Sequence, residues 1–495
     1  LREGDWKVTV AVDYLGQVIA VNPGFKESLC GLAVDVGSTT VAAHLCNLRT
    51  GEVLASAGMM NPQIRFGEDL MSRVSYVMMH PDGDAEMTKV IRETINELAE
   101  NVAAKANRQL DEIVEVTFVG NPIMHHLLLG INPIELGGAP FALATDESVR
   151  IRARDLKLTL HTNTRCYVLP CIAGHVGADT AGMILSEAPH KREAITLLVD
   201  IGTNAEIVLG NKERLLAASS PTGPAFEGAQ ITCGQRAAPG AIERVRIDRK
   251  TLEPKFKIIG CDLWSDETGF SKQTKKTGIT GICGSGIIEA IAEMYLAGVL
   301  TQDGVINGSF AEKSERIVSE DRTFSYILHD GEQHIHISQN DVRAIQLAKA
   351  ALYAGIRLLM ERLGIESVDR IRLAGAFGNH IEPKFAMILG LIPDCNLKQV
   401  SSAGNAAGTG ARIALLNHES RNEIEEVVRQ VEKVETAVET NFQQHFVNAM
   451  ALPHKIDKFP NLAKEVELPA DNMSENTYEN ATPTAKRRRR KTTNS

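Results

Sequence analysis

The stretch that decides the fold is ITLLVDIGTNAEIVLGNKERLLAASS, residues 195–220. An apolar strand ends at Asp200, a turn of Gly202, Thr203 and Asn204 follows, and two more strand-like segments come after it. Short apolar runs separated by turn residues predict a three-stranded meander. A carboxylate, a glycine and two short polar side chains interrupt two apolar segments that are otherwise typical of strands, which indicates a role for the turn beyond connecting them.

The same design occurs earlier in the chain, in CGLAVDVGSTTVAAHLCNLRTGEVLASAG, residues 30–58. Its turn carries Asp35, Gly37, Ser38, Thr39 and Thr40. The spacing between the copies is far longer than a solenoid repeat, so we expect two related domains that face each other. Helical periodicity follows each copy, at residues 84–109 and 340–363, which predicts an α/β fold with a mixed sheet in each half.

Both turns are typical of phosphate binding. Glycine lets the backbone approach an anion, and backbone N–H groups with neighbouring hydroxyls form a concave nest for phosphate oxygens. An aspartate at the strand end suits Mg²⁺, which prefers oxygen ligands and keeps several waters. One such turn is most often an ordinary hairpin, whereas two on matched meanders favour a polyphosphate held from both sides. The other phosphate-binding solutions are absent, since the chain has no G-x-x-x-x-G-K-[ST] and no G-x-G-x-x-G after a strand.

Composition excludes several classes of protein. The net charge of −9 gives no general attraction to nucleic acid. No apolar run approaches the roughly 20 residues of a membrane span, and the first residues show no signal-peptide pattern, so we expect a cytoplasmic protein. The eight cysteines are scattered without a Cys-x-x-Cys pair, which favours reduced thiols packed as small hydrophobic side chains.

With these motifs the chain resembles the sugar kinase, Hsp70 and actin (ASKHA) superfamily of ATPases. The resemblance implies two facing actin-like, RNase H-like α/β subdomains with an ATP cleft between them. Within this superfamily the chain is similar to the ATP-dependent reductive activators of corrinoid proteins. The strings that carry this similarity are NPQIRFGEDLMSRV (61–74), GPAFEGAQI (223–231), GICGSGII (281–288), LAGAFGNHI (373–381) and FQQHFVNAMALPH (442–454).

The resemblance implies that ATP hydrolysis drives reduction of Co(II) to Co(I) in a corrinoid protein of a methyltransferase system, so that methyl transfer resumes. Asp35 and Asp200 are expected to hold Mg²⁺, partly through water, and Glu206 to orient the attacking water. The residues expected to hold ATP are Gly37, Ser38, Thr39, Thr40, Gly202, Thr203, Asn204, Gly223, Gly284, Ser285, Gly375, Ala376 and Gly378.

The family also implies an iron–sulfur unit, commonly a [2Fe–2S] domain at the N-terminus. This chain has no cysteine set for such a cluster, so we expect either a missing upstream domain or an external electron donor. The expected domains are residues 1–30 as the remnant of a middle or linker domain, 31–190 as subdomain I, 191–460 as subdomain II and 461–495 as a disordered basic tail. Subdomain I would contain the phosphate-1 turn and the connect-1 segment (120–124). Subdomain II would contain the phosphate-2 turn, the adenosine segment and connect-2 (404–411), with its last helices able to return to subdomain I.

An apolar face over residues 418–440 predicts an amphipathic helix that packs on the core or forms a homodimer contact. Three alternative functions stay open at this stage. A small-molecule kinase of the same superfamily would use a base such as Asp69, and an actin-like scaffold or chaperone would use ATP to control assembly. An activase of a radical dehydratase would need a matching cysteine pair, which is not evident.

Overall fold

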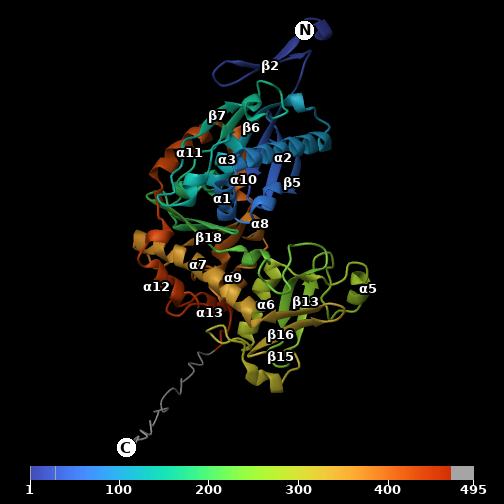
Figure 1. The fold of residues 1–495 in the computed structure, drawn as a ribbon, viewed down its shortest axis with the longest axis vertical. Helices are drawn as coiled ribbons and strands as arrows, with labels where there is room; N and C mark the ends of the chain where they lie inside the picture. Colours follow the sequence, from blue (N-terminus) through green and yellow to red (C-terminus); the bar gives the residue numbers. More distant parts are fainter. Residues whose placement is uncertain (1, 28, 379, 470–495) are drawn as a thin grey trace, which may run out of the picture.

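Two halves stacked along one long axis make up the molecule (Figure 1). The computed structural model describes residues 2–27, 29–378 and 380–469. Residues 30–192 form most of the upper half, coloured blue to green, and later residues form most of the lower half. A two-stranded hairpin, β1 (Val8–Val12) and β2 (Val18–Pro23), lies at the top. Among the described helices, none is long and apolar enough to cross a membrane.

The first half is built on a six-stranded sheet with the order β5-β4-β3-β6-β8-β7. β3, β4 and β5 form the predicted antiparallel meander, and β3 continues the sheet by pairing in parallel with β6. Their bounds are β3 Cys30–Val36, β4 Thr40–Asn47, β5 Val53–Met60, β6 Ile113–Gly120, β7 Val149–Arg152 and β8 Arg165–Val168.

The second half repeats this plan with the order β19-β18-β9-β10-β11-β20. Again three strands form a meander and the first of them pairs in parallel with a later strand, here β18. The bounds are β9 Thr196–Ile201, β10 Ala205–Gly210, β11 Leu215–Ser220, β18 Arg370–Ala374, β19 Val400–Gly404 and β20 Glu432–Lys433.

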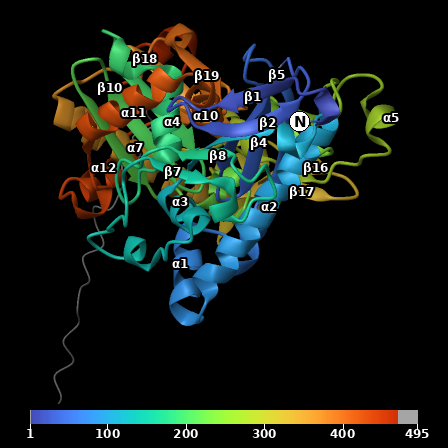
Figure 2. The ribbon, with the colours of Figure 1, turned by 90° about the horizontal axis from the view of Figure 1, so that it is seen from above.

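Alternate residues of β3 enter different cores, as the strand period requires. Leu32 and Val34 pack with α2 (Gly83–Lys105), whereas Ala33 packs with α4 (Ala178–Glu187) and α10 (Ala406–Leu416). Leu198 of β9 belongs to that second core too. Seen from above, α4, α10 and α11 (His418–Gln430) lie on one side of β8, and α2 and α3 (Pro122–Leu129) on the other (Figure 2). The layer of α4 and α10 is therefore shared by the two halves.

Glycines allow these two central helices to cross closely. A Cβ atom on Gly410 of α10 would lie 2.0 Å from the carbonyl oxygen of Gly182 in α4. The sequence-based assignment of residues 120–124 as the connection in the first half is corrected by this contact. Those residues end β6 and begin α3, whose buried side chains pack with α2 in the core of the first half.

Further elements enlarge the second half. α7 (Gln339–Leu363) packs on β10 and β11, while two small sheets with α6 (Gly284–Leu296) lie at the lower right of Figure 1. The strands of the small sheets are β12 Ala241–Ile247, β13 Pro254–Ile258, β14 Gly281–Ile282, β15 Ile317–Glu320, β16 Thr323–Asp330 and β17 His334–Ser338. The remaining helices are α1 Leu70–Met79, α5 Phe270–Thr274, α8 Gly375–Gly378, α9 Pro383–Leu389, α12 Phe442–Asn448 and α13 Leu462–Glu465.

Two boundaries near the C-terminus differ from those predicted. The helix expected over residues 418–440 ends at Gln430, because the next residues add β20 to the edge of the second sheet beside β11. Residues 461–466 are folded, since Leu462 is buried in the core and the Asn461 backbone N–H donates to Asp394. The folded chain thus passes the predicted boundary at 461, and the basic run at 486–491 lies outside the described residues.

Candidate active site between the two halves

The phosphate-1 turn joins β3 to β4 and is held from its outer side. Asn61, which follows β5, donates from Nδ2 to the Gly37 carbonyl and from its backbone N–H to the Thr39 carbonyl, both at 2.9 Å. The Arg73 guanidinium, fully buried, donates to the Ser38 carbonyl at 2.6 Å. These bonds occupy the carbonyls of the turn from the protein side and hold the turn in shape. The Asn61 and Arg73 positions in the NPQIRFGEDLMSRV string have this structural explanation.

The phosphate-2 turn joins β9 to β10 and is held in the same way by the segment after β11. The Thr222 hydroxyl donates to the carbonyls of Gly202 and Thr203 at 2.7 and 3.0 Å. The Gly223 backbone N–H donates to the Thr203 carbonyl at 2.9 Å, so Gly223 supports the turn. The Thr203 hydroxyl donates in turn to Glu227 Oε1 at 2.9 Å.

Four carboxyl groups gather where the two sheets face each other. Asp35 lies near the end of β3, Asp200 near the end of β9, and Glu206 directly opposite Asp200 on β10. The fourth, Asp179, lies in the first turn of α4. All four are half-buried.

Burial raises the pKa of each group, and repulsion by neighbouring carboxylates adds to the shift of Asp35, Asp200 and Glu206. Burial first, and then Asp179 and Asp35, raise the pKa of Asp200 to about 7. Burial also raises the pKa of Asp35 to about 7, although the hydrogen bond from Asn405 opposes the shift, and burial raises that of Asp179 to about 6. The pKa of Glu206 is raised well above its usual value by burial and by Asp179 and Asp200. Asp179 is the neighbour that the other three share, so the cluster is centred on it.

The contribution of Asp179 to the site was not predicted, and Asn405 was predicted only as part of the connect-2 segment, without a role for its side chain. Asn405 caps α10, accepting from the Gly408 N–H at 2.6 Å, and donates from Nδ2 to Asp35 at 2.9 Å. Each residue begins one of the two helices of the shared layer, in the strings GADTAG (177–182) and GNAAGTG (404–410). Two helix starts rich in small residues were the available signal.

Such a cluster suits a divalent cation, because packed carboxylates repel one another until a cation compensates their charge. Among the described residues, no three His, Cys, Asp or Glu side chains converge closely enough to hold a metal ion alone. An Mg²⁺ ion here would complete its shell with waters and phosphate oxygens, as Mg²⁺ does in nucleotide sites. Indirect coordination of such an ion by Asp35 and Asp200 stays a prediction.

The predicted adenosine segment lies against the cluster. α8 follows β18, where Ala374 pairs with Asp200. Gly375 has φ of +85°, and a Cβ there would lie 2.2 Å from Asp200 Oδ1, so both conformation and space require glycine. Gly378 is buried in the same short helix, and of Ala376 only the backbone is described. Gly284 and Ser285 are buried at the start of α6, where the Ser285 hydroxyl lies 3.4 Å from Cys283 Sγ, so a contact from them to ATP stays a prediction.

Comparison with known proteins agrees with this geometry. Residues 194–463 match the model of the C-terminal ASKHA domain of RACo, and residues 30–192 match its middle region. The chain belongs to the RACo family of reductive activators of corrinoid proteins. The predicted family and ASKHA fold are thereby confirmed.

Individual relatives support the same family. The corrinoid activation enzyme RamQ of Eubacterium limosum is 34% identical over 438 residues, which cover 86% of this chain and 71% of that protein. A Co(II) methylated amine-specific corrinoid protein reductase of Methanosarcina barkeri is 25% identical, covering 81% of this chain and 72% of that protein. A solved reductive activator for corrinoid, iron–sulfur protein superposes with a TM-score of 0.79 at 34% identity, covering 92% of this chain and 71% of that one.

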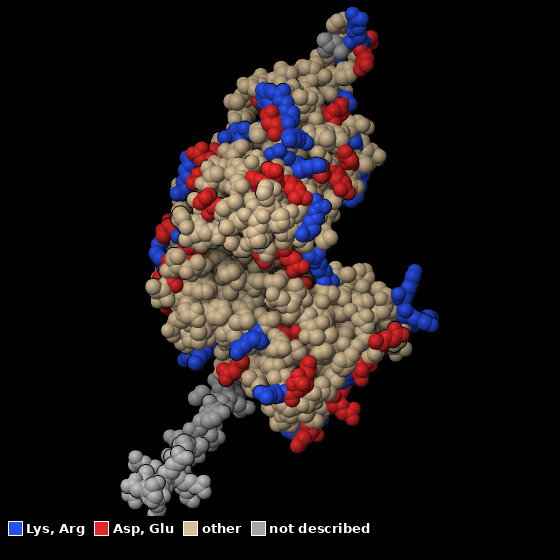
Figure 3. Space-filling model, in the orientation of Figure 1, with Lys and Arg blue, Asp and Glu red and all other residues tan. Residues whose placement is uncertain are grey.

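This RACo-family chain has a second compartment beside the phosphate turns. It is a cavity of about 260 Å³ lined from both halves, by Thr39 and Glu68 on one side and Thr203, Glu227 and Arg236 on the other. The Arg236 guanidinium reaches across to the Met60 sulfur at 2.9 Å. The surface in Figure 3 has a notch between the upper and lower halves on the right, with acidic and basic side chains at its edge.

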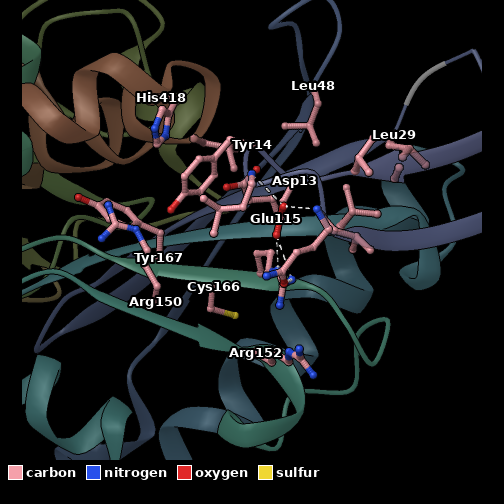
Figure 4. Close-up of a pocket in the computed structure, with 18 of the residues that line it drawn as sticks. Asp13, Tyr14, Leu29, Leu48, Glu115, Arg150, Arg152, Cys166, Tyr167 and His418 are labelled. Carbon is pink, nitrogen blue, oxygen red and sulfur yellow. Dashed lines mark hydrogen bonds and ion pairs between the residues drawn. The ribbon is translucent and has the colours of Figure 1, made fainter.

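A larger cavity of the RACo-family chain, about 880 Å³, lies elsewhere, under the N-terminal hairpin. Figure 4 shows Tyr14 beside His418, whose rings stack at 4.2 Å, and Asp13 close to Glu115. Its charged walls are paired already, Arg165 with Asp13 at 2.9 Å and Arg421 with Glu115 at 2.6 Å. Because neither phosphate turn and none of the four clustered carboxylates lines it, this cavity lies apart from the candidate nucleotide site.

All eight cysteines are free thiols, and only Cys233 is not buried. Burial raises the pKa of several of these thiols, that of Cys46 and of Cys395 to about 11. Protonated, separated thiols are poor cluster ligands. The described residues therefore offer no ligand set for the [2Fe–2S] cluster that the family resemblance implied.

Proposed function

We propose that this protein hydrolyses ATP to drive reduction of Co(II) to Co(I) in a corrinoid protein of a methyltransferase system. The observation that carries the proposal is the convergence of two phosphate turns and four carboxylates, in a chain whose relatives are named corrinoid activators. The electrons come from a donor outside the described residues, and the protein works in the cytoplasm.

In this proposal the two turns bind the ATP phosphates from opposite sides. Asp35 and Asp200 would hold Mg²⁺ through water, with Asp179 as their shared charged neighbour, and the cation would compensate charge on the phosphates. Glu206 stays in the carboxylate cluster beside Asp200. The N–H groups of both turns and the hydroxyls of Ser38, Thr39 and Thr40 bind phosphate oxygens, while the Thr203 hydroxyl stays bonded to Glu227. Gly375 lets the adenosine approach the backbone. The Gly223 N–H keeps the second turn in shape.

Closure of the cleft is the proposed mechanical step. The halves share α4 and α10, which cross at Gly182 and Gly410, and a ligand that binds both turns favours the closed arrangement by its differential affinity. Reduction of a protected Co(II) corrinoid is uphill, and each tenfold change in a one-electron equilibrium corresponds to about 59 mV. Binding of the activator would change the cobalt environment, and ATP turnover would release the partner. A homodimer is compatible with this scheme.

The test is ATP hydrolysis with and without a Co(II) corrinoid protein from a methyltransferase system, with a supplied low-potential reductant. The cobalt spectrum is followed in the same cuvette. We expect corrinoid-stimulated turnover and formation of Co(I), both lost in Asp200→Ala. ATP turnover that no corrinoid protein stimulates would contradict the proposal. ATP turnover that requires a small molecule with a hydroxyl group as acceptor would indicate a kinase. ATP turnover that accompanies filament formation would indicate a scaffold.

A further inference from the structure

We propose that Glu227 orients the water that attacks the γ-phosphorus, from a compartment on the far side of the phosphate turns. The proposal rests on the ATP hydrolysis proposed above and names the residue that controls it. Its basis is the position of Glu227 relative to both sheets and its bond to Thr203.

The strand order places the two compartments on opposite sides of the turns. In the second sheet, β18 with the adenosine segment flanks β9 on one side, and β10 followed by β11 lies on the other. Glu227 belongs to the short 3₁₀ helix Pro224–Glu227 that follows β11. In the first sheet, the segment after β5 that carries Glu68 takes the matching position. A nucleotide with its base at Gly375 therefore points its terminal phosphate toward the cavity of about 260 Å³.

This cavity has the size and polarity for water beside a phosphate. Water occupies about 30 Å³ per molecule in the liquid, so several molecules fit. Thr39 and Thr203, one from each phosphate turn, form the wall toward the nucleotide. Glu227 and Arg236 also line this cavity. Water there can reach the γ-phosphorus opposite the leaving ADP, the in-line direction that phosphoryl transfer needs.

Glu227 is fixed in this wall with one oxygen still available. Oε1 accepts from the Thr203 hydroxyl at 2.9 Å, and within the described residues Oε2 has no hydrogen-bond partner. The helix itself is anchored before and after Glu227. Gly223 donates to the phosphate-2 turn, and Gly228 (φ +86°) approaches Gln235 so closely that a Cβ would lie 2.8 Å from its carbonyl.

Two other glutamates near the turns, Glu206 and Glu68, fit this role less well. Glu206 lies opposite Asp200 in the carboxylate cluster, on the side of the metal. Glu68 lines the cavity but is exposed, and within the described chain it makes no hydrogen bond to either turn. Glu227 alone among the three contacts a phosphate turn from inside the compartment.

The step balances as follows. The water oxygen forms a bond to the γ-phosphorus while the bond from phosphorus to the bridging oxygen breaks, and that electron pair leaves with ADP. The proton released by the water passes to Glu227 or directly to the phosphate, and then to solvent. Because such transition states are loose, the main contribution of the protein is to position the water.

The test compares Glu227→Ala and Glu227→Gln with wild type, measuring single-turnover ATP hydrolysis, affinity for a non-hydrolysable ATP analogue, and thermal unfolding. We expect about a 100-fold slower hydrolysis in the alanine variant. The glutamine variant, which still accepts hydrogen bonds, should lose about tenfold, and both should keep analogue affinity within about threefold. Glu213→Gln, exposed in the β10–β11 turn at the opposite end of the sheet, is the matched control and should behave as wild type.

Hydrolysis by Glu227→Ala within about threefold of wild type would overturn the proposal, and so would equal loss of hydrolysis and analogue affinity, which indicates a structural role only. A double-mutant cycle of Glu227→Ala with Thr203→Val adds a second criterion. The losses of hydrolysis rate should be non-additive, because the two residues act together. If hydrolysis depends on Glu227 but no corrinoid protein changes its rate, this inference stands and the proposed corrinoid function is refuted. A wild-type protein that hydrolyses no ATP, alone or with a corrinoid protein, refutes both.

Discussion

Replacing Asp200 with asparagine should stabilise the metal-free protein at alkaline pH while abolishing its function. The Asp200 pKa is raised from 3.8 to about 7 by burial and by Asp179 and Asp35. An unfolded chain loses this proton near pH 4, and the folded one keeps it until about pH 7. The folded state therefore binds more protons in that window, and stability decreases as pH rises through it.

The size of the effect follows from the shift. The pKa shift of Asp200 spans about three pH units, and about two of them lie between pH 5 and pH 8. They correspond to a loss of at most ~3 kcal/mol of unfolding free energy. Because the Asp200 carboxyl is only half-buried, solvent screens its interactions, and we expect a loss of ~1–2 kcal/mol in unfolding free energy. Asp200→Asn removes this loss and also relieves Glu206, whose pKa Asp200 helps to raise.

The assay is urea unfolding in EDTA at pH 5 and pH 8. Other groups titrate in this range, so the quantity to compare is the change between the two pH values in wild type and in the variant. Asp262→Asn, at an exposed position, serves as the control. Equal pH dependence in wild type and Asp200→Asn, or a variant that loses more stability than wild type toward pH 8, would refute the electrostatic reasoning. With Mg²⁺ and ATP present at pH 8, wild type alone should be stabilised.

Three further predictions concern the elements around the site. Asp179→Asn should raise the Mg²⁺ concentration required for ATP hydrolysis by about 10- to 100-fold, as loss of a supporting carboxylate does elsewhere; an unchanged Mg²⁺ titration would exclude its central position. Gly410→Ala should lower the free energy of unfolding by roughly 1–3 kcal/mol, whereas Gly138→Ala, with open space around it, should not; similar denaturation midpoints would contradict the close crossing. Lys349→Met should cost roughly 2–4 kcal/mol, because the buried amino group donates to the carbonyls of Ala451 and Pro453. Arg343→Met on the exposed face of α7 is the control, and equal urea midpoints would count against the buried network.

The sequence predicted the parts of the site that are local in the chain. Asp35 and Asp200 each end a strand directly before a glycine turn, so strand pattern and turn chemistry located both. Asp179 and Asn405 could not be found in this way, because each reaches the cluster through the packing of a helix between the two sheets. The same limit explains residues 432–433, where sheet pairing with β11 overrides a continuous helical periodicity. Glu227 was visible in a family string, but its relation to Thr203 depends on how the segment after β11 returns to the turn.

The same two helices, α4 and α10, both connect the halves of the molecule and contribute side chains to the carboxylate cluster. The helices that cross at Gly182 and Gly410 also begin with Asp179 and Asn405, the side chains that face the carboxylates of both sheets. If the cleft closes on ATP as proposed, a change of charge at the cluster would act directly on the two helices that cross between the halves. Each half would then rotate as a unit, and a partner bound far from the nucleotide would sense the change without a relay of loops.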